Sequence, residues 1–241
     1  MTLAKQIRIQ INKWPIGKTF GYADLDISKK EYVTAAKALE RLQEEGLIKK
    51  ISKGVFYKPQ QTIFGELQPD YSEQLRPYLF ENGERVAYET GTSLYNRMGL
   101  TTQVAFRIKI ASRDKRISID RGALKANPVK SYAKVTEGNY KLLELLDAFK
   151  DIKQIPDCPV SKAVKILRGK INNLSSKQIK GLIKYALLYP PRVRALLGAV
   201  LEGLNRIKEL DILKDSLNPL TTFKLGLSEK DLSTIKNWYI E

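Results

Sequence analysis

The chain has 241 residues, with 42 Lys and Arg against 26 Asp and Glu, and therefore a formal net charge of +16. This excess favours an anionic partner, such as nucleic acid, an acidic protein or a membrane surface, although a generally basic proteome would produce it too. There is no His and only one Cys, Cys158, which excludes histidine-based catalysis, an intrachain disulfide and a cysteine zinc site.

The positive charge is concentrated in two places. Residues 1–58 carry 12 basic and 6 acidic side chains, and residues 151–194 carry 10 and 2. A helix is expected over residues 3–14, because Leu3, Ile7 and Ile11 share one face, and a very short one over residues 22–25.

A third helix is predicted within "SKKEYVTAAKALERLQEEG", residues 28–46. Ser28 and Glu31 form a capping-box pair at its start, and Gly46 is a typical stop. The apolar stripe runs along Ala35, Leu39 and Leu42. The opposite stripe holds Lys30, Thr34, Lys37 and Arg41.

A hairpin is predicted next, in "LIKKISKGVFYK", with Lys53 at its tip and Gly54 in the turn. Three helices followed by a basic hairpin indicate a winged helix-turn-helix over residues 1–60. Its third helix can lie in the major groove of double-stranded DNA while Lys53 reaches the flanking backbone. A solvated face or a surface for protein contacts remains the alternative.

Residues 61–241 are expected to form a second domain, so the fold class is α+β. Residues 61–136 are predicted as a mixed α/β part, with strands in 85–90, 103–112, 115–120 and 129–135 and a short helix in 91–100 closed by Gly99. Residues 137–241 are predicted to be helical, with helices in 136–152, 161–174, 175–188, 190–210 and 228–238.

The stretches "ALERLQEEGLIKKISKGVFYKP", "GTSLYNRMGLTTQVAFRIKIAS" and "YPPRVRALLGAVLE" resemble AbiEi-type antitoxins of type IV toxin–antitoxin (abortive infection) systems. The resemblance implies an N-terminal winged helix that represses its own promoter. It also implies a C-terminal part that counteracts a nucleotidyltransferase-like toxin. By position, the recognition-helix contacts would be Lys29, Lys30, Thr34, Lys37 and Arg41, with Lys53 as the wing contact.

A second basic face is predicted on the helices after residue 160, where few acids interrupt the run and neighbouring lysines would repel one another. Its target could be flanking DNA, the toxin or an RNA substrate of the toxin, and a solvated surface is the alternative. Its members are Lys162, Lys165, Arg168, Lys177, Lys180, Lys184, Arg192 and Arg194.

Enzyme signals are weak. "GKT" at residues 17–19 lacks the earlier Gly of a phosphate-binding loop, because position 12 is Asn12. "GTS" at residues 91–93 resembles the start of a nucleotidyltransferase site but is not followed by carboxylates, and the set Asp114, Asp120, Glu84 and Lys115 has no specific spacing. We therefore expect no catalytic residues, metal site or cofactor.

No signal peptide or membrane span is expected, which predicts a cytoplasmic protein. The predicted function is promoter binding for autorepression, combined with the antitoxin role that the resemblance implies. One alternative is a DNA-binding regulator whose C-terminal domain senses a ligand or dimerises. The other is a metal-dependent nuclease.

Overall fold

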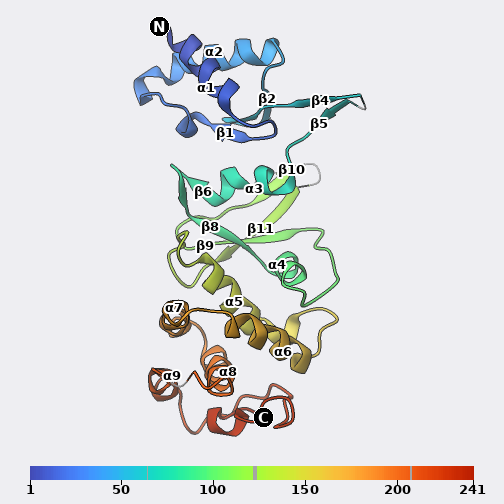
Figure 1. Cartoon of the computed structure of the whole chain (residues 1–241), viewed down its shortest axis with the longest axis vertical. Helices are drawn as coiled ribbons and strands as arrows, with labels where there is room; N and C mark the ends of the chain where they lie inside the picture. Colours follow the sequence, from blue (N-terminus) through green and yellow to red (C-terminus); the bar gives the residue numbers. More distant parts are fainter. Residues whose placement is uncertain (64, 122–123, 207) are drawn as a thin grey trace. The chain divides into compact units, whose positions relative to one another are not determined.

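The computed structural model describes residues 1–63, 65–121, 124–206 and 208–241, and it divides into two compact units, Met1–Arg85 and Val86–Glu241 (Figure 1). The sequence placed this boundary after residue 60 and a further one after residue 136. The first unit instead continues to Arg85, and the sheet and helices that follow form one body with a shared core. The chain is mixed α+β, as expected.

The first unit begins with two helices packed against a small antiparallel sheet whose strand order is β1-β3-β2. Its core includes Ile7, Ile11, Phe20, Leu39 and Phe56. Pairing of β2 with β3 confirms the predicted hairpin. The elements are α1 (Leu3–Lys13), β1 (Thr19–Gly21), the 3-10 turns η1 (Tyr22–Asp24) and η2 (Lys29–Glu31), α2 (Tyr32–Glu44), β2 (Lys49–Ser52) and β3 (Val55–Tyr57).

The start of α2 differs from the prediction. Ser28 and Glu31 do pair, since the Ser28 N–H and hydroxyl both donate to the Glu31 carboxylate at 2.8 Å. These contacts lower the pKa of Glu31. They close a 3-10 turn, however, and the α-helix begins only at Tyr32.

The part of the first unit that follows β3 is hydrogen-bonded to the edge strand β1 through α3. Thr19 is buried, its N–H donates to the Glu73 carboxylate at 2.8 Å, and its hydroxyl donates to the Glu73 carbonyl at 2.8 Å. Helix α3 therefore covers the open edge of the sheet, which explains why the unit extends past residue 60. The elements are β4 (Gln60–Thr62), β5 (Gly65–Leu67), α3 (Tyr71–Leu79), β6 (Phe80–Glu81) and β7 (Glu84–Arg85).

The second unit opens with a four-stranded sheet in the order β10-β11-β9-β8, in which β9 and β11 are parallel. The predicted strand at 103–112 forms only from Ile108 onwards. The one at 129–135 ends at Lys130 and begins earlier, at Leu124. Pro128 argues against a strand in the sequence, because proline has no N–H to donate to a neighbouring strand. It is tolerated here because β10 pairs only with residues 124–126, so β11 has no partner on that side at Pro128. The elements are β8 (Ala87–Thr90), α4 (Thr92–Arg97), β9 (Ile108–Ser112), β10 (Ile119–Arg121) and β11 (Leu124–Lys130).

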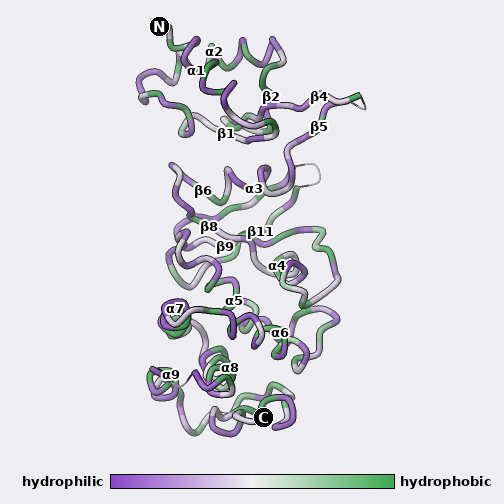
Figure 2. The backbone as a smooth tube through the Cα atoms, viewed as in Figure 1, coloured by the Kyte–Doolittle hydropathy of each residue, from purple (hydrophilic) through white to green (hydrophobic). Residues whose placement is uncertain are grey.

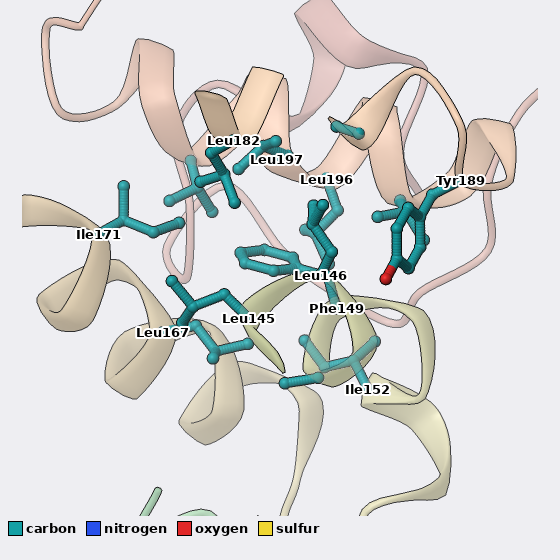
Figure 3. Close-up of a cluster of buried hydrophobic side chains, with 14 of the residues drawn as sticks. Leu145, Leu146, Phe149, Ile152, Leu167, Ile171, Leu182, Tyr189, Leu196 and Leu197 are labelled. Carbon is teal, nitrogen blue, oxygen red and sulfur yellow. The ribbon is translucent and has the colours of Figure 1, made fainter. Parts of the chain in front are cut away.

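The helices that follow the sheet in the second unit gather around α8, which is hydrophobic along most of its length (Figure 2). They are α5 (Tyr140–Lys150), η3 (Ile152–Gln154), α6 (Val160–Asn172), α7 (Ser176–Ala186), α8 (Pro191–Glu202), α9 (Leu210–Asp215) and η4 (Ile235–Trp238). Figure 3 shows the centre of this core, to which these helices and η3 contribute Leu145, Leu146, Phe149, Ile152, Leu167, Ile171, Leu182, Leu196 and Leu197. Within the described residues, no helix combines the length and apolarity that crossing a bilayer requires.

Two helical predictions near the C-terminus are wrong in extent. The helix expected over 190–210 ends at Glu202, and that expected over 228–238 is reduced to η4. Ser228 and Asp231 pair as a helix start would require, at 2.7–2.9 Å. An α-helix does not continue from this start, because tertiary packing places the buried ring of Trp238 directly against Gly198 of α8.

Candidate nucleic-acid interface

Helix α2 has one face in the core of the first unit and one in solvent. Ala35, Leu39 and Leu42 are almost fully buried, at 0–3 % exposure. The 3.6-residue period therefore turns the opposite stripe outward. Thr34, Lys37 and Arg41 are all exposed on that stripe.

Lys29 and Lys30 lie on the 3-10 turn that leads into α2, and both are exposed. Their position is fixed by the Ser28–Glu31 contacts rather than by the helix itself. The predicted interface residues of this segment therefore occupy two consecutive local structures instead of one continuous helix.

Most cations of this surface have no carboxylate partner in the described ranges 1–63, 65–121, 124–206 and 208–241. In the described part of the chain, no ion pair involves Lys29, Lys30, Lys37 or Arg41. One nearby acid, Glu45, is instead engaged by Arg8 of α1. Unpaired cations retain their attraction for an external anion, which paired cations have largely lost.

The β2–β3 turn presents Lys53, which is exposed. Gly54 has a φ of +73°, a backbone conformation that side chains disfavour, so glycine suits this tight turn. Lys49 of the same hairpin is less available, because its ammonium is 2.5 Å from the Glu66 carboxylate. That carboxylate also accepts the Tyr57 hydroxyl, at 2.5 Å. Burial and this contact together raise the pKa of Tyr57 to about 12.

Sequence reasoning missed Val33, which is 74 % exposed on the outer side of α2. It lies one turn before Lys37, and an apolar side chain in that place can contact a thymine methyl group. The signal was present: a β-branched residue stands on the polar stripe of an otherwise amphipathic helix.

The lysines of the predicted second basic face are exposed. Lys162 and Lys165 belong to α6, whereas Lys177, Lys180 and Lys184 belong to α7. Helix α6 packs on α8, and α7 packs on α5, α8 and α9. Among the described residues, Lys180 is the one lysine of this set that forms an ion pair, since its ammonium lies 2.9 Å from the Glu209 carboxylate.

The three arginines of that predicted face must be reassigned, because each is half-buried and bonded to a backbone carbonyl. Arg168 donates to the Gly203 carbonyl at 2.7 Å, at the end of α8. Arg192 and Arg194 donate to the Lys150 and Ser216 carbonyls at 2.8 and 2.9 Å, at the ends of α5 and α9. A cation stabilises the unpaired carbonyls of a helix C-terminus, so these arginines hold the helices together.

A buried carboxylate in the second unit was also missed. Asp147 of α5 is 2 % exposed and accepts hydroxyl protons from Thr90 at 2.7 Å and from Tyr88 and Tyr189 at 3.0 Å. Burial, followed by the Asp147 charge, raises the pKa of Tyr88 and Tyr189. The tyrosines therefore stay protonated and serve as donors, which is a structural arrangement.

Some residues of the weak enzyme signals make structural contacts. In the Gly17–Thr19 stretch, the Thr19 hydroxyl donates to the Glu73 carbonyl, and the Lys18 ammonium lies 4.2 Å from the centre of the Trp14 ring. Asp120 pairs with Arg107 at 3.3 Å. Across the residues that the structure describes, no three His, Cys, Asp or Glu side chains are grouped to hold a metal ion.

Comparison with known proteins gives a family and a similar fold. The model of a family of unknown function, DUF6088, matches residues 6–184. A crystal structure of the Rv2827c protein from Mycobacterium tuberculosis is similar in fold, with a TM-score of 0.50 and 13 % identity over 91 % of this chain and 83 % of that one. No curated protein has a significant match to the chain.

Proposed function

Because the chain belongs to the DUF6088 family, whose function is unknown, we propose a function from its own residues: it is a DNA-binding regulator. The proposal rests on one observation, the exposed stripe of Thr34, Lys37 and Arg41 on α2 with cations that have no carboxylate partner among the described residues. The order α1, β1, η1, α2, β2, β3 supports the assignment of residues 1–60 as a winged helix-turn-helix.

In this proposal α2 enters the major groove of double-stranded promoter DNA. Lys29 and Lys30 lie on the 3-10 turn immediately before α2, and Lys37 lies in its first half. The cations therefore gather at the N-terminal end of α2, the part of a recognition helix that makes most base contacts. Lys37 and Arg41 would contact phosphates or guanine edges, and Thr34 would donate to a base or phosphate. Lys53 would contact the backbone beside the site.

A solvated surface is the simplest alternative, since Glu40 and Glu44 are also exposed on α2. These acids occupy the second half of the helix, beside Arg41, where they lower the net positive charge of that half. The alternative predicts no saturable binding to promoter DNA, so binding measurements separate the two interpretations.

The test is fluorescence anisotropy with DNA from upstream of the protein's own gene, compared with scrambled DNA of equal length. Lys37→Ala with Arg41→Ala should weaken binding by roughly tenfold or more and reduce the salt slope by about 2, one unit for each lost phosphate contact. The matched control is Lys224→Ala with Lys230→Ala, which removes two exposed cations from the other unit. Equal affinity of the two double variants would rule out α2 as the interface.

We also propose that the protein is an antitoxin that counteracts a nucleotidyltransferase-like toxin, because its sequence resembles AbiEi-type antitoxins. If its partner is promoter DNA, the protein would act in the cytoplasm. The exposed lysines of α6 and α7 offer a surface for the toxin or its RNA target, whereas Arg168, Arg192 and Arg194 are engaged within the unit.

Co-expression with a toxin-like neighbouring gene tests this role. The wild type should restore growth, and a variant combining Lys162→Glu, Lys165→Glu and Lys184→Glu should restore it less while still binding the promoter. Full rescue by that variant would show that these lysines are not needed to counteract the toxin. We propose no catalytic activity, and nucleic-acid cleavage that depends on a divalent metal would contradict this.

A further inference from the structure

A pocket of about 610 Å³ lies in the second unit, between the first turns of α7 and the segment that joins α8 to α9. Its α7 side includes Ile179 and Ile183, which are 6 % and 3 % exposed and belong to the core. The volume is within the range of small-molecule sites, which are mostly apolar with a few placed polar groups.

The rim of this pocket is cationic. Lys177 and Lys180 line it from α7, and Arg206 and Lys208 line it from the opposite segment. Glu209 is the acid among its described lining residues, and it is held by Lys180 at 2.9 Å. Within the described residues, the other three cations form no ion pair and remain available to a ligand. They lie beside a helix start whose dipole also favours negative charge.

The walls of the pocket are set by local backbone structure. Ser175 and Gln178 form a capping box that fixes the first turn of α7. On the other side, the lining residues Asn205 and Glu209 both have left-handed backbone, with φ values of +56° and +64°. Leu210 and Leu213 anchor the start of α9 in the core.

We propose that this pocket binds a small organic anion, with its charged group on the lysine and arginine rim and its apolar body on Ile179 and Ile183. Nucleic-acid backbone is a poorer match, because phosphates and sugars gain little from an apolar floor. The inference is independent of DNA binding by the first unit, so either can fail alone.

A matched pair of fluorescent probes tests the proposal on the full chain. 1-Anilinonaphthalene-8-sulfonate carries a negative charge, and N-phenyl-1-naphthylamine has the same aromatic body without it. The sulfonate should bind at one saturable site and more tightly than the neutral probe. Lys177→Glu with Arg206→Glu should weaken sulfonate binding by roughly tenfold and change binding of the neutral probe little.

Two further variants locate the site. Ser176→Trp fills the pocket from an exposed position and should reduce binding of both probes. Lys165→Glu, on α6 outside the pocket, should change neither. Unchanged sulfonate affinity in the Lys177→Glu, Arg206→Glu variant would overturn the proposal. Equal affinity for the two probes would overturn it as well.

Discussion

Replacing Asp147 with Ala should destabilise the second unit severely. The change removes the acceptor of three buried hydroxyl groups, those of Tyr88, Thr90 and Tyr189, at 2.7–3.0 Å. A buried donor left without a partner costs about 1–3 kcal/mol. The substitution also removes the free-energy cost of burying the Asp147 carboxylate, which offsets part of this loss. We therefore expect the free energy of unfolding to fall by about 3–5 kcal/mol. The total for a typical domain is about 5–15 kcal/mol.

The conservative change Asp147→Asn should cost less, about 1–3 kcal/mol, because the amide oxygen still accepts and hydroxyl groups can rotate to accept from the amide nitrogen. Together the two substitutions separate loss of the acceptor from loss of the charge.

Urea denaturation followed by tryptophan fluorescence provides the measurement. In a Trp14→Phe background, the signal comes from Trp238, which is buried in the second unit. Asp211→Ala, an exposed acid on α9, is the control and should change the free energy of unfolding by less than about 0.5 kcal/mol. A loss below about 1 kcal/mol in Asp147→Ala would show that the hydroxyl network is not a major source of stability.

Three other changes give distinct expectations. Gly198→Ala should destabilise the second unit by about 1–3 kcal/mol in the same assay, because the new methyl group would lie 2.2 Å from the Trp238 ring. Arg194→Ala should cost about 1–3 kcal/mol by freeing the Ser216 carbonyl, whereas Lys184→Ala should have almost no effect. Tyr57 has a folded pKa of about 12 against an ordinary value of 10, so its contribution is present below pH 10 and is lost as pH rises towards 12. Tyr57→Phe should therefore lose less stability than the wild type between pH 9 and pH 11.5 in chemical denaturation, and identical slopes would refute the assignment.

Much of the first unit could be predicted because its signals are local. The apolar period of Ile7 and Ile11 identified α1, and the pair Ser28 and Glu31 identified the entry to α2. The turn at Gly54 marked the hairpin. Each of these signals lies within one helix turn or one tight turn, the range over which sequence patterns are most informative.

The errors arise where partners are distant in the chain. Arg168 looked like a surface cation, and its acceptor, the Gly203 carbonyl, is 35 residues away. The segment 228–238 starts as a helix should, but the packing of Trp238 on Gly198 interrupts it. The burial of Asp147 could have been predicted from the sequence, since an acid within the apolar run "LLELLDAF" indicates a buried polar contact.

The attachment of Glu73 to Thr19 determines where this protein can be divided. Cutting after residue 60 would strip α3 from β1 and leave the Thr19 amide and hydroxyl without their acceptors. An exposed edge strand of this kind can pair with a strand of another molecule and cause aggregation. A fragment or fusion protein that carries the first unit alone should therefore keep the chain intact through Arg85.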